Sequence, residues 1–165
     1  MAGSGIVVRL AAADEAAAIA ALLYQAFVEY EQLYLPEAFA ATTPTAGQIA
    51  KRFDEGPIWI ALQDGVPVGT LSAVPRGQAL YIRSSAVLPA ARGLGIGKSL
   101  LQQAEAFAHS RGCGLIVLST TPFLLQAIRL YESFGFQRSP EGPLDLFGTP
   151  LLTMVKRLAH ERGPQ

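Results

Sequence analysis

The sequence has few cysteines, few histidines and no excess of either charge, and each shortage excludes a class of function. Cys113 is the single cysteine, so an intrachain disulfide and a cysteine-based zinc cluster are both excluded. The two histidines, His109 and His160, lie far apart without the spacing of metal ligands, and we expect no metal. Thirteen basic and thirteen acidic residues give a formal net charge of +0. This balance argues against a nucleic-acid partner, because that affinity depends on an excess of lysine and arginine.

Long hydrophobic runs are also missing. No apolar stretch approaches the ~20 residues that cross a bilayer, and residues 1–5 lack the basic start and long apolar run of a secretory signal. We therefore expect no membrane partner and a cytoplasmic location. The 165 residues, half of them hydrophobic, suit one domain, which we place at residues 1–158. The polar tail at residues 159–165 is expected to fray.

The spacing of hydrophobic residues predicts a mixed α/β sheet, in which antiparallel strands come first and strands alternate with helices later. Asp64 and Gly65 lie between two β-like runs, a strong hairpin signal because glycine adopts the positive φ of a tight turn. Strands are expected at residues 6–10, 58–62, 66–74, 79–88 and 115–118, near residue 136, and at residues 151–158. Helices are expected between residues 14 and 30 and over residues 45–55, 95–111 and 123–134, with a loop at residues 31–45 that Pro36 and Pro44 interrupt.

A glycine-rich segment, residues 92–99, lies between an expected strand and an expected helix and has the sequence Arg-Gly-Leu-Gly-Ile-Gly-Lys-Ser. Glycines let the backbone approach a ligand closely, and the N-terminus of the following helix favours anions, so a pyrophosphate is the expected ligand. A Walker loop would need a first glycine at Arg92, and a Rossmann loop would need its third glycine at Lys98 or Leu100. The remaining pattern is Arg-x-x-Gly-x-Gly. A nucleotide kinase or phosphohydrolase is a weaker alternative, because it depends on residues 97–99 alone.

Around this loop the sequence resembles the GNAT superfamily of acyl-CoA-dependent N-acetyltransferases, and the resemblance covers most of the chain. Its centre is residues 86–97, and residues 118–120 and 127–136 agree with the family in order and distance. The resemblance implies an α/β (α+β) fold with a central mixed, mostly antiparallel sheet of six to seven strands. About four helices would flank this sheet, which would be splayed between the fourth and fifth strands. It also implies direct transfer of an acetyl group from acetyl-CoA to a primary amine of a small molecule or peptide.

The resemblance assigns cofactor contacts to the loop and to the strand before it. In the family, backbone N–H groups of the loop hold the CoA pyrophosphate. The strand pairs with the pantetheine arm, whose amides need partners in a partly dry groove. An N–H near Val87 is expected to polarise the thioester carbonyl, and Pro89 ends the pairing because it has no N–H. The implied cofactor residues are Ala86, Val87, Leu88, Arg92, Gly93, Leu94, Gly95, Ile96, Gly97 and Lys98.

Tyr131 matches the family's usual general acid. A phenol with an unperturbed pKa of about 10 stays protonated at neutral pH and can donate to the departing CoA thiolate; the alternative is an ordinary half-buried aromatic. The strand glutamate often found in the family corresponds to Tyr81 here, and residues 65–104 contain no acidic side chain. We take Glu29 as the candidate base, with Glu31, a nearby tyrosine or a water chain as alternatives.

Acceptor contacts are expected from Tyr30, Tyr81 and Arg83. Tyr81, Arg83 and Ser85 should share one face of a strand, because side chains alternate along it. Arg83 is then either a partner for a substrate carboxylate or an ordinary salt-bridged arginine. Tyr24, Tyr30 and Tyr34 either line the acceptor pocket or pack within the helical region.

The missing strand carboxylate keeps a second function open, namely a CoA-binding sensor or regulatory module with little or no turnover. The identity of the amine acceptor and the oligomeric state are also open, a homodimer among the options.

Overall fold

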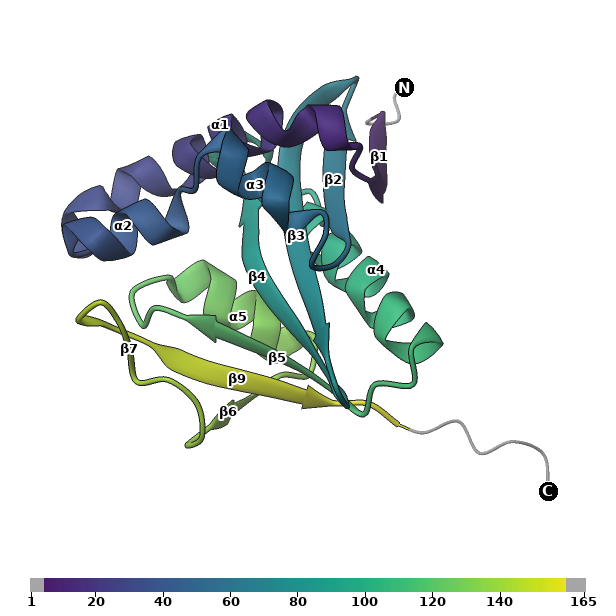
Figure 1. The fold of residues 1–165 in the computed structure, drawn as a ribbon, viewed down its shortest axis with the longest axis vertical. Coiled ribbons are helices and arrows are strands. Elements are labelled where there is room, and N and C mark those ends of the chain that lie inside the picture. Colours follow the sequence, from purple (N-terminus) through teal and green to yellow (C-terminus); the bar gives the residue numbers. More distant parts are fainter. Residues whose placement is uncertain (1–4, 160–165) are drawn as a thin grey trace.

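A seven-stranded mixed sheet forms the centre of the molecule in the computed structural model, which describes residues 5–159 (Figure 1). The strand order is β1-β2-β3-β4-β5-β9-β6, and only the β4–β5 pair is parallel. The strands are β1 (Ile6–Leu10), β2 (Ile58–Gln63), β3 (Val66–Arg76), β4 (Ala79–Val87), β5 (Leu115–Thr120), β6 (Gln137–Ser139) and β9 (Leu152–Arg157). A separate two-stranded hairpin consists of β7 (Asp145–Leu146) and β8 (Thr149–Pro150). The expected mixed, mostly antiparallel sheet is therefore confirmed.

Helices cover both faces of the sheet, and each face has its own hydrophobic cluster. The helices are α1 (Ala16–Phe27), α2 (Pro36–Thr42), α3 (Ala46–Arg52), α4 (Ile96–Ser110) and α5 (Leu125–Ser133). The first three lie on one face, where Ile19 and Leu23 of α1 pack with Ile58 and Ile60 of β2. The last two lie on the other face, where Leu100 of α4 is fully buried. No helix within the described residues is long and apolar enough to cross a membrane.

The expected loop at residues 31–45 is wrong, because the structure places a 3-10 helix at Val28–Leu33 and α2 at Pro36–Thr42. Pro36 is the first residue of α2, where its missing N–H costs nothing, so this proline starts a helix. The burial of Phe39 then stabilises a segment whose periodicity is too short to recognise. The helix expected at residues 45–55 is shorter and ends at Arg52. Thr45 caps its N-terminus by accepting a hydrogen bond from the Gln48 N–H.

The β7–β8 hairpin, which the sequence pattern did not predict, reaches back to the N-terminal helices. The Leu35 N–H donates to Oγ1 of Thr149 at 3.0 Å, and these two residues are 114 positions apart. Gly148 has a φ of +89°, and a Cβ there would lie 2.7 Å from Cδ1 of Leu35. This contact joins α2 to the C-terminal part of the chain. Residues 160–165, most of the tail that was expected to fray, lie outside the described residues.

The sheet divides between β4 and β5, as the sequence predicted. The two strands pair only over four positions, Ala79–Ile82 against Leu115–Leu118, and then separate (Figure 1). Ser84 has a φ of +54°, and three steps along β4, from Arg83 to Ala86, oppose two steps along β3. An extra residue of this kind bends a strand and increases its twist. The bulge at Ser84 therefore accompanies the divergence of β4 from β5.

Candidate active site

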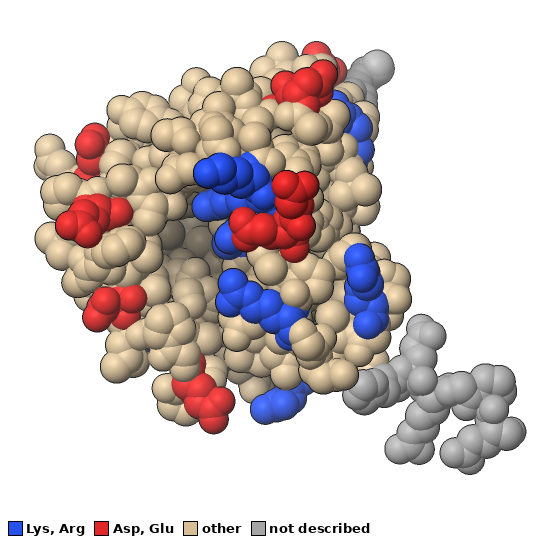
Figure 2. Space-filling model, viewed as in Figure 1, with Lys and Arg blue, Asp and Glu red and all other residues tan. Residues whose placement is uncertain are grey.

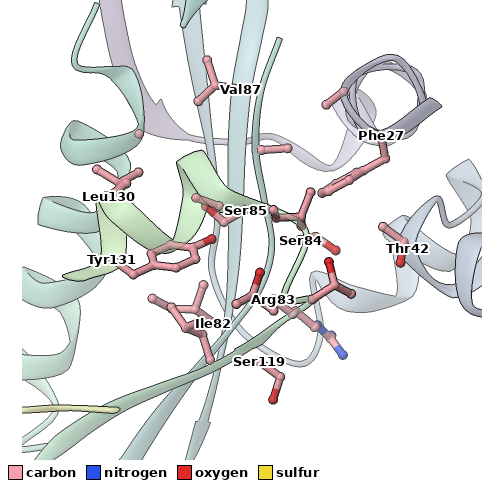
Figure 3. A pocket seen from close by; sticks show the side chains of 18 of the residues that line it. Phe27, Thr42, Ile82, Arg83, Ser84, Ser85, Val87, Ser119, Leu130 and Tyr131 are labelled. Carbon is pink, nitrogen blue, oxygen red and sulfur yellow. The ribbon is translucent and has the colours of Figure 1, made fainter. Parts of the chain in front are cut away.

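A cavity of about 1240 Å³ opens where β4 and β5 diverge. Its walls come from the second half of β4, the loop before α4, the end of β5, α5, the N-terminal helices and the β7–β8 hairpin (Figure 3). Most residues singled out from the sequence line it: Tyr30, Tyr81, Arg83, Ala86, Val87, Arg92, Gly93, Gly95, Ile96, Gly97, Lys98 and Tyr131. Three others do not: Glu29, Leu88 and Leu94. The fold thus brings residues from distant parts of the sequence to one cavity.

The glycine loop has the geometry of an anion site. Gly93 and Gly95 have φ values of +84° and +79°, and a Cβ at either position would meet no atom within 4 Å. The Ser99 N–H bonds the Gly95 carbonyl at 3.0 Å, so the amides of residues 96–98 precede the first hydrogen bond of α4 and lack acceptors within the helix. Such free amides, together with the helix dipole, favour a bound phosphate.

Gly97 serves a different purpose, because it faces a neighbouring helix. A Cβ at this position would lie 2.7 Å from Cδ2 of Leu130 in α5. The missing side chain therefore lets the first turn of α4 approach α5 closely. This approach brings the loop and the helix that carries Tyr131 to the same cavity.

Arg92 contributes its side chain rather than its amide. Its N–H donates to the Pro89 carbonyl at 3.3 Å within the turn, so that amide is already engaged. The guanidinium lines the cavity, with Nε donating to the Val87 carbonyl at 3.3 Å and Nη1 lying 3.0 Å from Oε1 of Glu29. Glu29 therefore holds the arginine of the glycine loop and does not itself line the cavity.

The backbone of β4 leaves Val87 available at the divided edge. The Leu88 N–H donates to the Val68 carbonyl of β3 at 2.8 Å, so Leu88 has no free amide for a ligand. Val87 opposes Gly69 in the same ladder. Because successive residues of an antiparallel strand bond to opposite sides, the N–H and C=O of Val87 point away from β3. The N–H is thus directed toward the gap between β4 and β5.

Tyr131 lies in α5 with only 6% of its surface exposed. Its ring packs edge-on against Phe136, with ring centres 5.9 Å apart, and its hydroxyl points toward Ser85 (Figure 3). Burial raises the pKa of the Tyr131 phenol, and the facing Ser85 hydroxyl only partly opposes this rise. The phenol is therefore protonated at neutral pH and is able to donate a proton into the cavity.

Ser85 does not share a face with Tyr81 and Arg83, contrary to the expectation from strict alternation. The bulge at Ser84 breaks the alternation, because Arg83 and Ala86 oppose residues only two apart on β3. Ser85 consequently points toward Tyr131, while Arg83 forms an ion pair with Glu55 (Figure 3). The bulge thus separates a proton-donor side of the cavity, at Ser85 and Tyr131, from an arginine side, at Arg83.

The arginine side contains two cations that the sequence analysis missed, Arg52 and Arg76. Arg52, the last residue of α3, donates from Nη1 to Oγ of Ser84 at 2.7 Å. Burial, with a smaller contribution from the charge of Arg83, lowers the pKa of Arg52 to about 10. Arg76 lies over the ring of Tyr81, 5.0 Å from its centre. Figure 2 shows basic side chains gathered at the rim of a hollow on this face, with acidic ones beside them.

Acidic groups are absent from the cavity lining, which includes no Asp, Glu or His among the residues that the structure describes. Within the same residues, no three His, Cys, Asp or Glu side chains come together as a metal-binding group. Tyr30 and Tyr34 do line the cavity, and burial raises the pKa of Tyr34. Polar chemistry in this cavity therefore depends on hydroxyls, backbone groups, the Gln126 amide and the basic side chains of lysine and arginine.

Comparison with known proteins identifies the family. A sequence model of the acetyltransferase (GNAT) family matches residues 18–136. The chain belongs to this family. A relative from Mus musculus, named as a member of N-acetyltransferase family 8 (member 5), is 36% identical over 91 residues, which make up 51% of this chain and 40% of that protein. The GNAT chain thus spans well under half the length of this curated relative.

Solved structures show the GNAT fold over nearly the whole chain. The PaiA N-acetyltransferase of Thermoplasma acidophilum, solved with coenzyme A, has a TM-score of 0.80 at 15% identity and covers 93% of this chain and 99% of its own. The protein YncA of Salmonella typhimurium, solved with acetyl-CoA, has a TM-score of 0.73 at 22% identity and covers 97% of this chain and 98% of its own. The fold expected from the sequence resemblance is confirmed.

Proposed function

We propose that this GNAT domain binds acetyl-CoA and transfers its acetyl group directly to a primary amine of a small molecule or peptide. The observation that carries the proposal is the joint placement, in one cavity, of free helix N-terminal amides and a protonated buried tyrosine. The two solved relatives that hold coenzyme A or acetyl-CoA support the same ligand.

The loop fits a diphosphate in charge and in space. Gly93 and Gly95 leave room for close approach, and the amides of residues 96–98 offer donors. Lys98 and the guanidinium of Arg92 add positive charge at the cavity wall. The pantetheine arm then follows the open edge of β4, where Val87 presents its N–H; the Val87 carbonyl already accepts a hydrogen bond from Nε of Arg92.

The reaction requires one C–N bond to form and one C–S bond to break. The Val87 N–H stabilises the negative charge that develops on the thioester oxygen. Tyr131 donates its proton to the departing thiolate. The proton released from the amine balances the one that Tyr131 gives up, so the phenol is restored after each turnover.

The proton of the attacking amine needs an acceptor. Glu29 is our candidate from the sequence, and its ion pair with Arg92 places it at the loop rather than in the cavity lining. The arginines around the cavity offer a second route, because nearby positive charge lowers the pKa of a bound amine and favours its neutral, nucleophilic form.

A thiol-release assay tests the function. The protein is incubated with acetyl-CoA and a panel of amines, and free CoA thiol is measured together with the acetylated product. We expect amine-dependent thiol release in a 1:1 ratio to product. Calorimetry with CoA runs in parallel. Tight CoA binding without thiol release for any amine would instead support the sensor module.

A further inference from the structure

The arginine side of the cavity has more positive charge than the protein itself balances. Three guanidinium groups line it, those of Arg52, Arg76 and Arg83. The one carboxylate paired with them among the described residues is Glu55, whose Oε2 lies 2.7 Å from Nη2 of Arg83. The Nη1 of Arg52 has a neutral partner, the Ser84 hydroxyl. Nε of Arg83 is buried and has no hydrogen-bond partner.

Charge held in this way is unfavourable without an anion. Removing a guanidinium from water costs free energy unless a partner compensates, and two neighbouring cations add mutual repulsion. The lowered pKa of Arg52 reflects both effects. The planar fork of an arginine matches a carboxylate, which accepts two parallel hydrogen bonds from it. A carboxylate ligand would satisfy Arg52 and Arg83 together.

The position of Arg52 limits where the amine of such a ligand can lie. Arg52 contacts Ser84, and the next residue, Ser85, faces the Tyr131 hydroxyl. Ser84 and Ser85 are adjacent in β4, and both line the cavity with Arg52 and Tyr131. A carboxylate on Arg52 and the proposed proton donor therefore belong to the same part of the cavity. This arrangement favours an acceptor whose amine is attached close to its carboxylate.

The rest of the acceptor end combines aromatic and apolar side chains with threonine hydroxyls, among them Thr42 and Thr121. Phe27, Tyr30 and Tyr34 line it from the N-terminal helices, and Leu146 lines it from the β7–β8 hairpin. Tyr34 packs edge-on against Phe123, with ring centres 4.9 Å apart, so this wall is held in place. This wall has no carboxylate that would pair with a basic side chain of the acceptor. It offers an apolar surface against which a hydrophobic side chain of the acceptor can pack.

We propose that the acceptor is a free α-amino acid with an apolar or aromatic side chain, whose carboxylate binds Arg52 and Arg83 while its amine faces Ser85 and Tyr131. The inference rests on the proposed acetyl transfer and specifies its substrate. Arg52 is the main contact, because Arg83 is shared with Glu55. The side chain of the acceptor packs against the aromatic wall.

A matched series of amines tests the carboxylate. L-Phenylalanine, L-phenylalaninamide and phenethylamine carry the same side chain with a carboxylate, a neutral amide and neither group. We expect kcat/KM for L-phenylalanine to exceed the other two by ~10²-fold or more, because a site built for a polar group rejects an analogue that lacks it. Nα-acetyl-L-lysine, whose free amine is remote from its carboxylate, should react as poorly as phenethylamine.

Variants of Arg52 and Glu55 distinguish carboxylate recognition by Arg52 from a purely structural role of this residue. Arg52→Gln should raise KM for L-phenylalanine by ~10²-fold and lower kcat/KM for phenethylamine much less, because phenethylamine has no carboxylate for the guanidinium to bind. Arg52→Lys should recover part of the loss. Glu55→Gln should act in the opposite direction and lower KM for L-phenylalanine several-fold, because Arg83 is released from its internal partner. Arg157→Gln, at an exposed position on β9 outside the cavity, is the control.

The outcomes are distinguishable. Equal kcat/KM for the amino acid and its two analogues overturns the carboxylate inference and leaves the acetyl transfer standing. A parallel loss for L-phenylalanine and phenethylamine in Arg52→Gln, with lowered thermal stability, assigns Arg52 to holding α3 against β4 and also overturns the inference. No thiol release with any amine overturns the proposed function, and the inference falls with it.

Discussion

Tyr131 is the side chain on which the proposed chemistry depends most directly. Tyr131→Phe keeps the ring that packs against Phe136 and removes only the hydroxyl that faces Ser85. We expect kcat to fall by ~10²-fold with unchanged affinity for CoA, because general acid catalysis contributes that much and the hydroxyl is not part of the phosphate site. Steady-state kinetics and calorimetry measure the two quantities. An unchanged kcat between pH 6 and pH 9 would remove Tyr131 from the acid role.

Glu29 allows a second prediction about a single residue. Its carboxylate lies 3.0 Å from Arg92, and its side chain is 44% exposed, so the ion pair is weakened by solvent. We expect Glu29→Gln to change KM for acetyl-CoA by no more than a few-fold and to leave the pH dependence of kcat unchanged. Glu31→Gln, in the same 3-10 helix, is the control. Loss of the acidic limb of the pH–rate profile would instead establish Glu29 as the base.

Single residues also show what could be predicted from the sequence. The glycine loop was singled out by its spacing, and Tyr131 was singled out by the family resemblance of residues 127–136. Arg52 was missed because its place beside the cavity depends on a contact with Ser84, which is 32 residues further along the chain. Ser85 was assigned to the wrong face of the strand because strict alternation does not allow for a β-bulge. The sequence around Ser84 gives no signal of the positive φ at this residue.

At the level of elements, the turn before α4 carries the cofactor prediction. Gly95 and Gly65 have nearly equal φ values, +79° and +82°, and a Cβ at either would meet no atom within 4 Å. Gly95→Ala and Gly65→Ala should therefore lower stability alike, by about 1 kcal/mol. Only Gly95→Ala should weaken CoA binding, by tenfold or more in calorimetry. Equal CoA affinity in both variants would contradict the phosphate site.

Elements with a clear hydrophobic pattern were predicted well, and two elements without one were missed. The stripe of α4 and the apolar run of β5 extend far enough to define their type. The helix α2 and the β7–β8 hairpin contain too few residues for periodicity to define them. Tertiary contacts stabilise both, through burial of Phe39 and through the bond from Leu35 to Thr149. These two elements happen to form walls of the acceptor end.

For the whole molecule, we expect cofactor binding in the cavity of the divided sheet to raise the free energy of unfolding. A ligand that binds the folded state alone at 100 times its Kd adds about 2.7 kcal/mol, which for a chain of this size raises Tm by roughly 5–10 °C. We expect CoA to produce this shift. ATP at the same concentration should produce little, because the loop lacks the spacing of a Walker motif. A larger shift with ATP than with CoA, measured by differential scanning fluorimetry, would favour a nucleotide enzyme.

The contact between Leu35 and Thr149 has a consequence for how new specificities arise on this scaffold. The proposed carrier-binding groups of residues 86–98 lie in the middle of the chain, whereas part of the wall around the incoming amine comes from both flanks, residues 26–52 and 142–153. Since the flanks are bonded to each other through Leu35 and Thr149, remodelling one of them disturbs the other. Evolution or engineering of a different side-chain preference should therefore involve paired replacements in both flanks.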